Sequence, residues 1–262
     1  MYSAVMVAAT GLTNQQRRLD TIADNLANVN TAGFKASRLD FKDALYTANS
    51  LGLVATPAPL GNTQRGHGVM VSMIGRIFSD GSISQTGIEL DFALEGEAFF
   101  QLQSSSGETL FTRGGNFYIT EDAMGRTFLV DSSGSFIHDA AGQRIEIPQG
   151  TMSITCDEAG VLTFTGADGS EVLGQTGLGL FTFVNLKGLE SAGNGYYRQG
   201  VAAGEKLAAQ SFKVRQGALE SSNVNLTEEM TRMIRAQRAF SLASRALTTA
   251  DDMEGIANNL RR

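Results

Sequence analysis

The sequence predicts an α+β protein, in which helices at the two chain ends pair as a coiled-coil-like domain around a central antiparallel β-rich domain. Apolar residues recur at helical spacing in the first and last segments, whereas the middle consists of short alternating runs separated by turn residues. The expected organisation is an N-terminal helical part over 1–46, an extended loop or arm over 47–68, a β-rich domain over 69–214, and a C-terminal helical part over 215–262.

Apolar residues in the first segment alternate at spacings of three and four, which is the seam of a coiled coil. Gln15 interrupts the seam, where it either fixes the register or merely lies at its edge. Residues 30–33 then favour a stop, because asparagine and glycine tolerate the left-handed conformation that follows a helix. The predicted helix covers 5–29, and its seam residues are Val5, Leu12, Leu19, Ile22, Leu26 and Val29.

The last segment opens with the spacing of a capping box, in which Asn225 caps the helix and the Glu228 carboxylate reaches back. A four-three repeat of mostly apolar residues follows and predicts a helix over 225–260. Because a helix with one apolar stripe gains stability by packing that stripe, we expect the two terminal helices to pair. The predicted seam residues of this helix are Leu226, Met230, Met233, Gln237, Phe240 and Leu247.

In the middle of the chain, the spacing of apolar residues is no longer helical. Residues 47–68 are rich in small and turn residues and contain Pro57 and Pro59, which favours an extended loop or arm. From 69 to 214, short alternating runs are separated by glycine-containing turns, which is typical of an antiparallel β domain. The whole chain contains 30 glycines and only 3 prolines, which suits short strands joined by tight turns.

Residues that carry chemistry are sparse. The only histidines, His67 and His138, and the single cysteine, Cys156, lack the spacing of metal ligands, and Cys156 is expected to be a small buried hydrophobic residue. No nucleophile elbow and no complete glycine-rich phosphate motif occurs. The net charge of −6 argues against a nucleic-acid partner. We therefore expect no enzyme activity, no cofactor, no metal and no small-molecule substrate.

No apolar run approaches the roughly 18 residues that a membrane span needs. The first residues lack the basic and apolar regions of a signal peptide, so we expect any export to use a route without signal-peptide cleavage.

Residues 25–35, Asn-Leu-Ala-Asn-Val-Asn-Thr-Ala-Gly-Phe-Lys, resemble the N-terminal signature of bacterial flagellar rod and hook proteins. Residues 219–225 and the helix after them resemble the C-terminal part of the same family, and segments within 85–117 and 179–190 agree in order. The sequence departs from the family's common pattern at residues 97–98 and 239–240. These departures bear on which member of the family the chain resembles more than on the resemblance to the family itself. The motif residues are Asn25, Asn28, Gly33 and Phe34 near the N-terminus and Ser222, Asn223 and Asn225 near the C-terminus.

The resemblance implies a structural subunit of the flagellar axial structure, most similar to the distal-rod members of the family. Such subunits are exported unfolded by the flagellar type III apparatus and polymerise helically into a hollow driveshaft that crosses the periplasm and links motor to hook. Their terminal helices line the inner tube, and the β domain forms the outer layer. The implied partners are further copies of the chain, adjacent rod, hook and bushing-ring proteins, and the export apparatus.

Three alternatives stay open at this point. The chain could be a proximal rod protein or another axial protein of the hook and basal body. It could be a secreted β-rich binding protein whose helices form a stalk, which would give a discrete oligomer rather than a filament. A hydrolase with a site on the β loops would need a cleft that converges on His67 or His138 beside a carboxylate.

Overall fold

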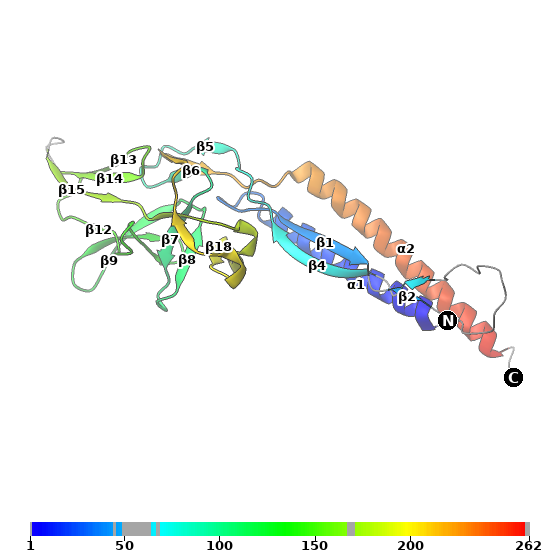
Figure 1. The fold of residues 1–262 in the computed structure, drawn as a ribbon. Helices are drawn as coiled ribbons and strands as arrows, with labels where there is room; N and C mark the ends of the chain where they lie inside the picture. The colour runs from blue at the N-terminus through cyan, green and yellow to red at the C-terminus, as the bar shows by residue number, and fades with distance from the viewer. Residues whose placement is uncertain (1, 44–45, 49–63, 67–68, 167–170, 260–262) are drawn as a thin grey trace. The chain divides into compact units, whose positions relative to one another are not determined.

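The computed structural model describes residues 2–43, 46–48, 64–66, 69–166 and 171–259 (Figure 1). The chain packs as two compact units. The helical unit comprises residues 1–27, 37–75 and 225–262, and the β unit comprises residues 28–36 and 76–224. The predicted α+β class, with a helix at each end and a β-rich middle, is confirmed.

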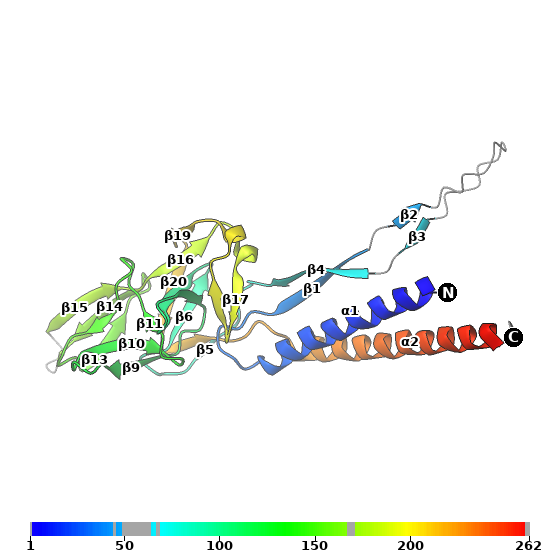
Figure 2. The same ribbon diagram turned by 90° about the horizontal axis from the view of Figure 1, so that it is seen from below.

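Two long helices dominate the helical unit. Helix α1 spans Tyr2–Ala27 and helix α2 spans Leu226–Asn259. The helices lie side by side in both views, and the start of α1 lies at the same end of the pair as the end of α2 (Figures 1 and 2). They therefore run antiparallel.

Two short β ladders complete the helical unit. β1, Ser37–Asp43, pairs with β4, Val69–Arg76, and β2, Tyr46–Ala48, pairs with β3, Gln64–Gly66. β1 packs against α1, and the Asn14 side chain of α1 donates a hydrogen bond to the Val69 carbonyl. Apart from β2 and β3, the predicted arm over 47–68 lies almost wholly outside the described residues, as does His67.

The main sheet of the β unit contains ten strands of the described chain, and its ladders are antiparallel. β7 is a central strand, since it pairs with β8, β11 and β16. Glycine turns that the sequence predicted join neighbouring strands: Gly107 and Gly134 have φ of +85° and +78°, which a β-carbon would oppose. The strands are β7 Phe99–Gln103, β8 Thr109–Thr112, β9 Phe117–Glu121, β10 Thr127–Asp131, β11 Phe136–Ile137, β12 Glu146–Ile147, β16 Leu180–Phe183, β17 Glu190–Gly193, β18 Tyr196–Arg198 and β19 Lys206–Ala208.

Smaller antiparallel ladders surround this sheet. β13 Ser153–Cys156, β14 Val161–Thr165 and β15 Val172–Gly177 form a three-stranded sheet. β6 Phe92–Gly96 pairs with β20 Phe212–Gln216, and β5 Ile83–Gln85 pairs with β21 Ala218–Glu220. Two single-turn 3-10 helices, η1 Leu186–Gly188 and η2 Val201–Ala203, flank β17 and β18 in the sequence.

The core of the β unit consists of two clusters. The larger one lies between the main sheet and the smaller ladders and includes Phe92, Phe100, Leu129 and Phe164. The smaller one is mostly aromatic, and Phe99, Phe111, Phe183 and Tyr197 meet there edge to face, an arrangement that the ring quadrupole favours. The two clusters make the β unit the well-packed part of the chain. It also contains the two connecting segments, residues 28–36 after α1 and residues 217–224 before α2.

Candidate assembly site

The predicted N-terminal seam lies on α1, except that the helix ends before Val29. Ile22 is buried, with 4% of its surface exposed, and the other five seam residues are half-buried in the single chain. A stripe that is partly covered retains surface for a further neighbour. As an assembly seam, this set stays a prediction.

The predicted C-terminal seam is placed differently on α2. Met233, Phe240 and Leu247 are half-buried, whereas Leu226, Met230 and Gln237 are exposed in the single chain. The side of α2 that is most covered is rich in small residues instead. Its buried or half-buried members include Ala236, Ala239, Ala243 and Ala250. The exposed members of the predicted seam are thus available to a partner, and their role in assembly stays a prediction.

The N-terminal motif residues tie down the chain after α1. Asn25 is 1% exposed, and its side chain makes two hydrogen bonds to the backbone of Ser37, at 2.9 and 2.7 Å. The Asn28 side chain accepts a hydrogen bond from the Thr31 hydroxyl. Phe34 is buried in the β unit, with the Arg76 guanidinium 5.2 Å above its ring.

Gly33 lies in the β unit with φ of +68°, and a β-carbon there would come within 2.4 Å of the Gly114 nitrogen. Its own nitrogen donates a 2.8 Å hydrogen bond to the Glu220 carbonyl. The backbones of residue 33 and residue 114 therefore approach so closely that only glycine fits.

The C-terminal motif residues also bond to backbone. The Asn223 side chain donates to the carbonyls of Ile77 and Ser79 and accepts from the Ala36 nitrogen at 2.7 Å. The Ser222 hydroxyl accepts from the Val224 nitrogen. Asn223 thus joins the N-terminal and C-terminal connecting segments inside the β unit.

Asn225 begins α2 in the predicted way, because its side-chain oxygen accepts a hydrogen bond from the Glu228 nitrogen at 3.2 Å. The Glu228 carboxylate does not reach back to complete the predicted box. It pairs with Arg232 one turn along the helix, where a full positive charge is a stronger partner than an amide.

A buried charge cluster, formed by Lys35, Arg113 and Glu220, lies between the two connecting segments of the β unit. Each of these residues is at most 2% exposed. The Glu220 carboxylate accepts from the Lys35 ammonium at 2.7 Å and from the Arg113 guanidinium at 3.0 and 3.2 Å. Arg113 also donates to the Asp80 carboxylate at 2.8 Å, and Lys35 to the Ser79 carbonyl at 2.7 Å. The cluster joins residues that are up to 185 positions apart.

Burial by itself raises the pKa of Glu220, but hydrogen bonds and charges from Arg113 and Lys35 outweigh it and hold that pKa below its usual value. Burial, followed by repulsion from Arg113, lowers the pKa of Lys35, and the attraction to Glu220 offsets this only partly. Glu220 is therefore the ionised anchor of the cluster at neutral pH.

Chemistry other than packing is scarce among the described residues. They contain no group of three or more His, Cys, Asp or Glu side chains placed to hold a metal ion. His138 is 6% exposed, and burial together with the charge of Arg144 lowers its pKa. Burial raises the pKa of the Cys156 thiol to about 12, so the thiol is protonated and unreactive at neutral pH. Neither described helix combines the length and apolarity that crossing a membrane requires.

The sequence did not predict the buried charge cluster. Lys35, Arg113 and Glu220 occur in the motif segments, but sequence spacing alone does not bring them together. In each segment a charged residue beside an apolar motif was the only indication in the sequence. Only the folded structure shows that these three residues pair with one another.

Family models match three segments of the chain, in order. The model for the flagella basal body rod protein matches residues 6–35, the flagellar hook protein FlgE/F/G D1 domain matches residues 93–164, and the flagellar basal body rod FlgEFG protein C-terminal model matches residues 215–260.

Relatives are similar along the full length. The flagellar basal-body rod protein FlgG of Borreliella burgdorferi is 37% identical, over 100% of both chains. The FlgG protein of Bacillus subtilis is 36% identical, over 100% of this chain and 98% of its own. The flagellar hook-basal body complex protein FlhP of Bacillus subtilis is 33% identical, over 100% of both chains.

Proposed function

The chain belongs to the flagellar basal-body rod family, and on this premise we propose that it polymerises helically as a subunit of the distal rod. It is a structural component of the basal body and is exported by the flagellar type III system, as the family is. The observation that carries the proposal is the full-length similarity to FlgG rod proteins together with the family-model matches at both ends of the chain.

The exposed surface of α2 supports polymerisation. Along this helix, large apolar side chains are uncovered in the single chain, and Met230, Ile234 and Leu242 are 48, 53 and 66% exposed. Apolar surface of this kind marks a contact with another protein. A contact that joins two different faces of identical subunits does not close, and it generates a filament.

The finer arrangement is also a proposal. Within one subunit, α1 and α2 pair as a coiled coil through the half-buried seam residues, and their exposed apolar residues pack on the helices of neighbouring subunits. The helices form the inner wall of a tube, and the β unit forms its outer layer. The partners are copies of the chain, the adjacent rod, hook and bushing-ring proteins, and the export apparatus; the role is mechanical, without catalysis.

The test is a charge on the exposed apolar surface of α2. Met230→Asp should abolish or strongly reduce polymer formed by the purified chain. The Met230 side chain is 48% exposed in the monomer, and in the proposed polymer a neighbouring subunit buries it, so a charge there would lose its hydration without a partner. Thr249→Asp, also exposed on α2, is the matched control and should polymerise normally. Sedimentation and electron microscopy measure the outcome, and circular dichroism confirms that both monomers fold. A discrete closed oligomer of the parent chain would contradict the proposal.

A further inference from the structure

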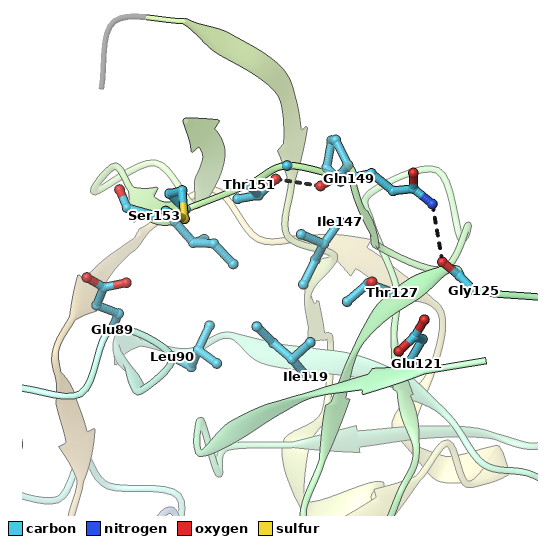
Figure 3. A pocket seen from close by; sticks show the side chains of 14 residues that line it. Glu89, Leu90, Ile119, Glu121, Gly125, Thr127, Ile147, Gln149, Thr151 and Ser153 are labelled. Atoms are coloured by element: carbon cyan, nitrogen blue, oxygen red, sulfur yellow. Dashed lines mark hydrogen bonds between the residues drawn. The ribbon is translucent and has the colours of Figure 1, made fainter. Parts of the chain in front are cut away.

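A groove of about 480 Å³ opens on the β unit between the β9–β10 hairpin and the three-stranded sheet (Figure 3). Its apolar wall combines buried and uncovered residues: Ile119 is 50% and Met152 75% exposed. Figure 3 shows Glu89 and Glu121 on opposite sides of the apolar Leu90 and Ile119. We call this the acidic groove, and its defining residues are Glu89, Leu90, Ile119, Glu121, Ile147 and Met152.

The two carboxylates of the acidic groove are exposed, and within the described parts of the chain neither Glu89 nor Glu121 takes part in an ion pair. Glu158 of the β unit is also exposed but is paired, with Lys213 at 3.1 Å, whereas other exposed glutamates such as Glu97 and Glu146 belong to no ion pair among the described residues. An apolar floor between two uncompensated negative charges fits a partner surface that carries apolar side chains and one cation.

The β unit carries such a surface on the loops of η1 and η2, which we call the valine knob and define by Val184, Lys187 and Val201. Val184 is 74% exposed and Val201 is fully exposed, at 104%. Lys187 is also exposed and, among the described residues, belongs to no ion pair. The knob therefore offers two apolar side chains and one free positive charge.

The base of the valine knob is held firmly. The Asn185 nitrogen donates to the Ala203 carbonyl at 3.2 Å, and its side chain donates to the Ala202 carbonyl at 3.0 Å. Ala203 is fully buried in the aromatic cluster. Because its base is fixed, the knob can enter a partner without a large entropic cost of ordering.

The knob and the groove lie at opposite ends of the β unit. The elements beside the knob, β17 and β18, lie at one end, whereas β9 and β13, which line the groove, lie at the other in Figures 1 and 2. A chain cannot place its own knob in its own groove. A contact between them joins two copies head to tail, which is the heterologous geometry of an open filament.

We propose that the valine knob of one copy docks into the acidic groove of the next copy, with Lys187 between Glu89 and Glu121. The inference rests on the proposed function, since it presumes a helical polymer, and it adds a specific contact between the β units. The two unpaired carboxylates meet the unpaired lysine, and the exposed valines cover the exposed Ile119 and Met152.

The experiment measures the concentration of purified full-length chain at which half of it polymerises. Val201→Asp and Lys187→Glu should each raise this concentration at least about tenfold, since a loss of 1.4 kcal/mol per contact gives a factor of ten. Val172→Asp is the matched control, because Val172 is 53% exposed on β15 and lies outside both surfaces, and it should polymerise as the parent does. The double variant Lys187→Glu with Glu121→Lys should recover part of the loss, because the reversed pair again attracts while the unchanged charge of Glu89 now repels.

A cross-link gives an independent measurement. In a Cys156→Ser background, the combination Val201→Cys with Met152→Cys should form a disulfide-linked ladder of multimers on oxidation of the polymer, and either single cysteine should not. If the parent polymerises while the substitutions change nothing and no ladder forms, the knob-and-groove contact is wrong and the proposed function stands. If the parent forms only monomers or closed oligomers, the proposed function fails and this inference with it.

Discussion

Glu220 joins parts of the β unit that are distant in the sequence. Its carboxylate accepts hydrogen bonds from Lys35, Arg113 and the Gly81 nitrogen, and its carbonyl accepts from the Gly33 nitrogen. A buried charge is tolerated only when partners replace its lost hydration, and here one carboxylate serves two cations. The residue therefore links both connecting segments to each other and to Arg113 within the β unit.

Glu220→Gln should lower the free energy of unfolding of the β unit by about 3–5 kcal/mol at pH 7, because it leaves buried Lys35 without its counter-charge and buried Arg113 with only the exposed Asp80. Its pH dependence should also change. The pKa of Glu220 is lower in the folded state than the unfolded value of 4.5, so its stabilising contribution is fully present above pH 4.5 and is lost as the pH falls through the folded pKa. Urea unfolding of parent and variant from pH 7 to pH 3 measures this. Parallel profiles for the two proteins would contradict the role assigned to Glu220.

Gly33→Ala should destabilise the β unit by more than the roughly 1–3 kcal/mol that a left-handed non-glycine residue costs. The reason is that the new β-carbon also meets the backbone of Gly114 at 2.4 Å. Gly134→Ala is the matched control, since Gly134 has φ of +78° but open space around its β-carbon position, and it should cost less. Thermal unfolding of both variants separates the backbone strain that they share from the steric collision that only Gly33→Ala introduces. Equal losses of stability in the two variants would show that the structure shifts to relieve the collision.

At the scale of elements, α1 and α2 illustrate how far a hydrophobic period predicts packing. The helices exist where the three-four spacing places them, and the cap at Asn225 is in its predicted position. The covered side of α2 includes Ala236 and Ala239 rather than Met230. Small residues let helices approach closely, but they contribute little to a hydrophobic pattern. A seam predicted from that pattern is therefore biased toward the positions of large apolar residues.

Phe240→Asp on α2, or Leu26→Asp on α1, should block polymerisation while the β unit stays folded. Both side chains are half-buried in the helical unit, and a charge there needs a desolvation that no partner compensates. Sedimentation should show loss of polymer, whereas the unfolding transition of the β unit should be unchanged. Normal polymers from either variant would show that these seam positions do not contribute to assembly.

At the scale of the whole molecule, the two units differ in how well they are packed. The β unit contains both apolar clusters, whereas the helical unit leaves many large apolar side chains on α2 uncovered. Segments with few buried contacts open most readily. Under the proposed polymerisation, the helices complete their packing only against neighbouring subunits, so we expect the chain ends to be less stable than the β unit before assembly.

Limited proteolysis should therefore cleave the monomer first within α1 and α2, and the β unit should persist as a resistant fragment. The polymer should protect the same terminal segments, because neighbouring subunits cover the exposed surface of α2. Mass spectrometry of the fragments identifies the sites. Termini that resist protease as well as the β unit does in the monomer would contradict this difference in stability.

The sequence by itself determined the two terminal helices, the β-rich middle and the family, because hydrophobic period, turn glycines and motif order are local or ordered along the chain. It also identified Gly33 and Asn223 as motif residues without revealing what they do. Only the tertiary structure decided that Lys35, Arg113 and Glu220 share one buried site, which side of α2 is covered, and that the acidic groove and the valine knob lie at opposite ends of the β unit. These features depend on contacts between residues far apart in the chain, and such contacts are set by how strands and helices pack rather than by the spacing of residues along them.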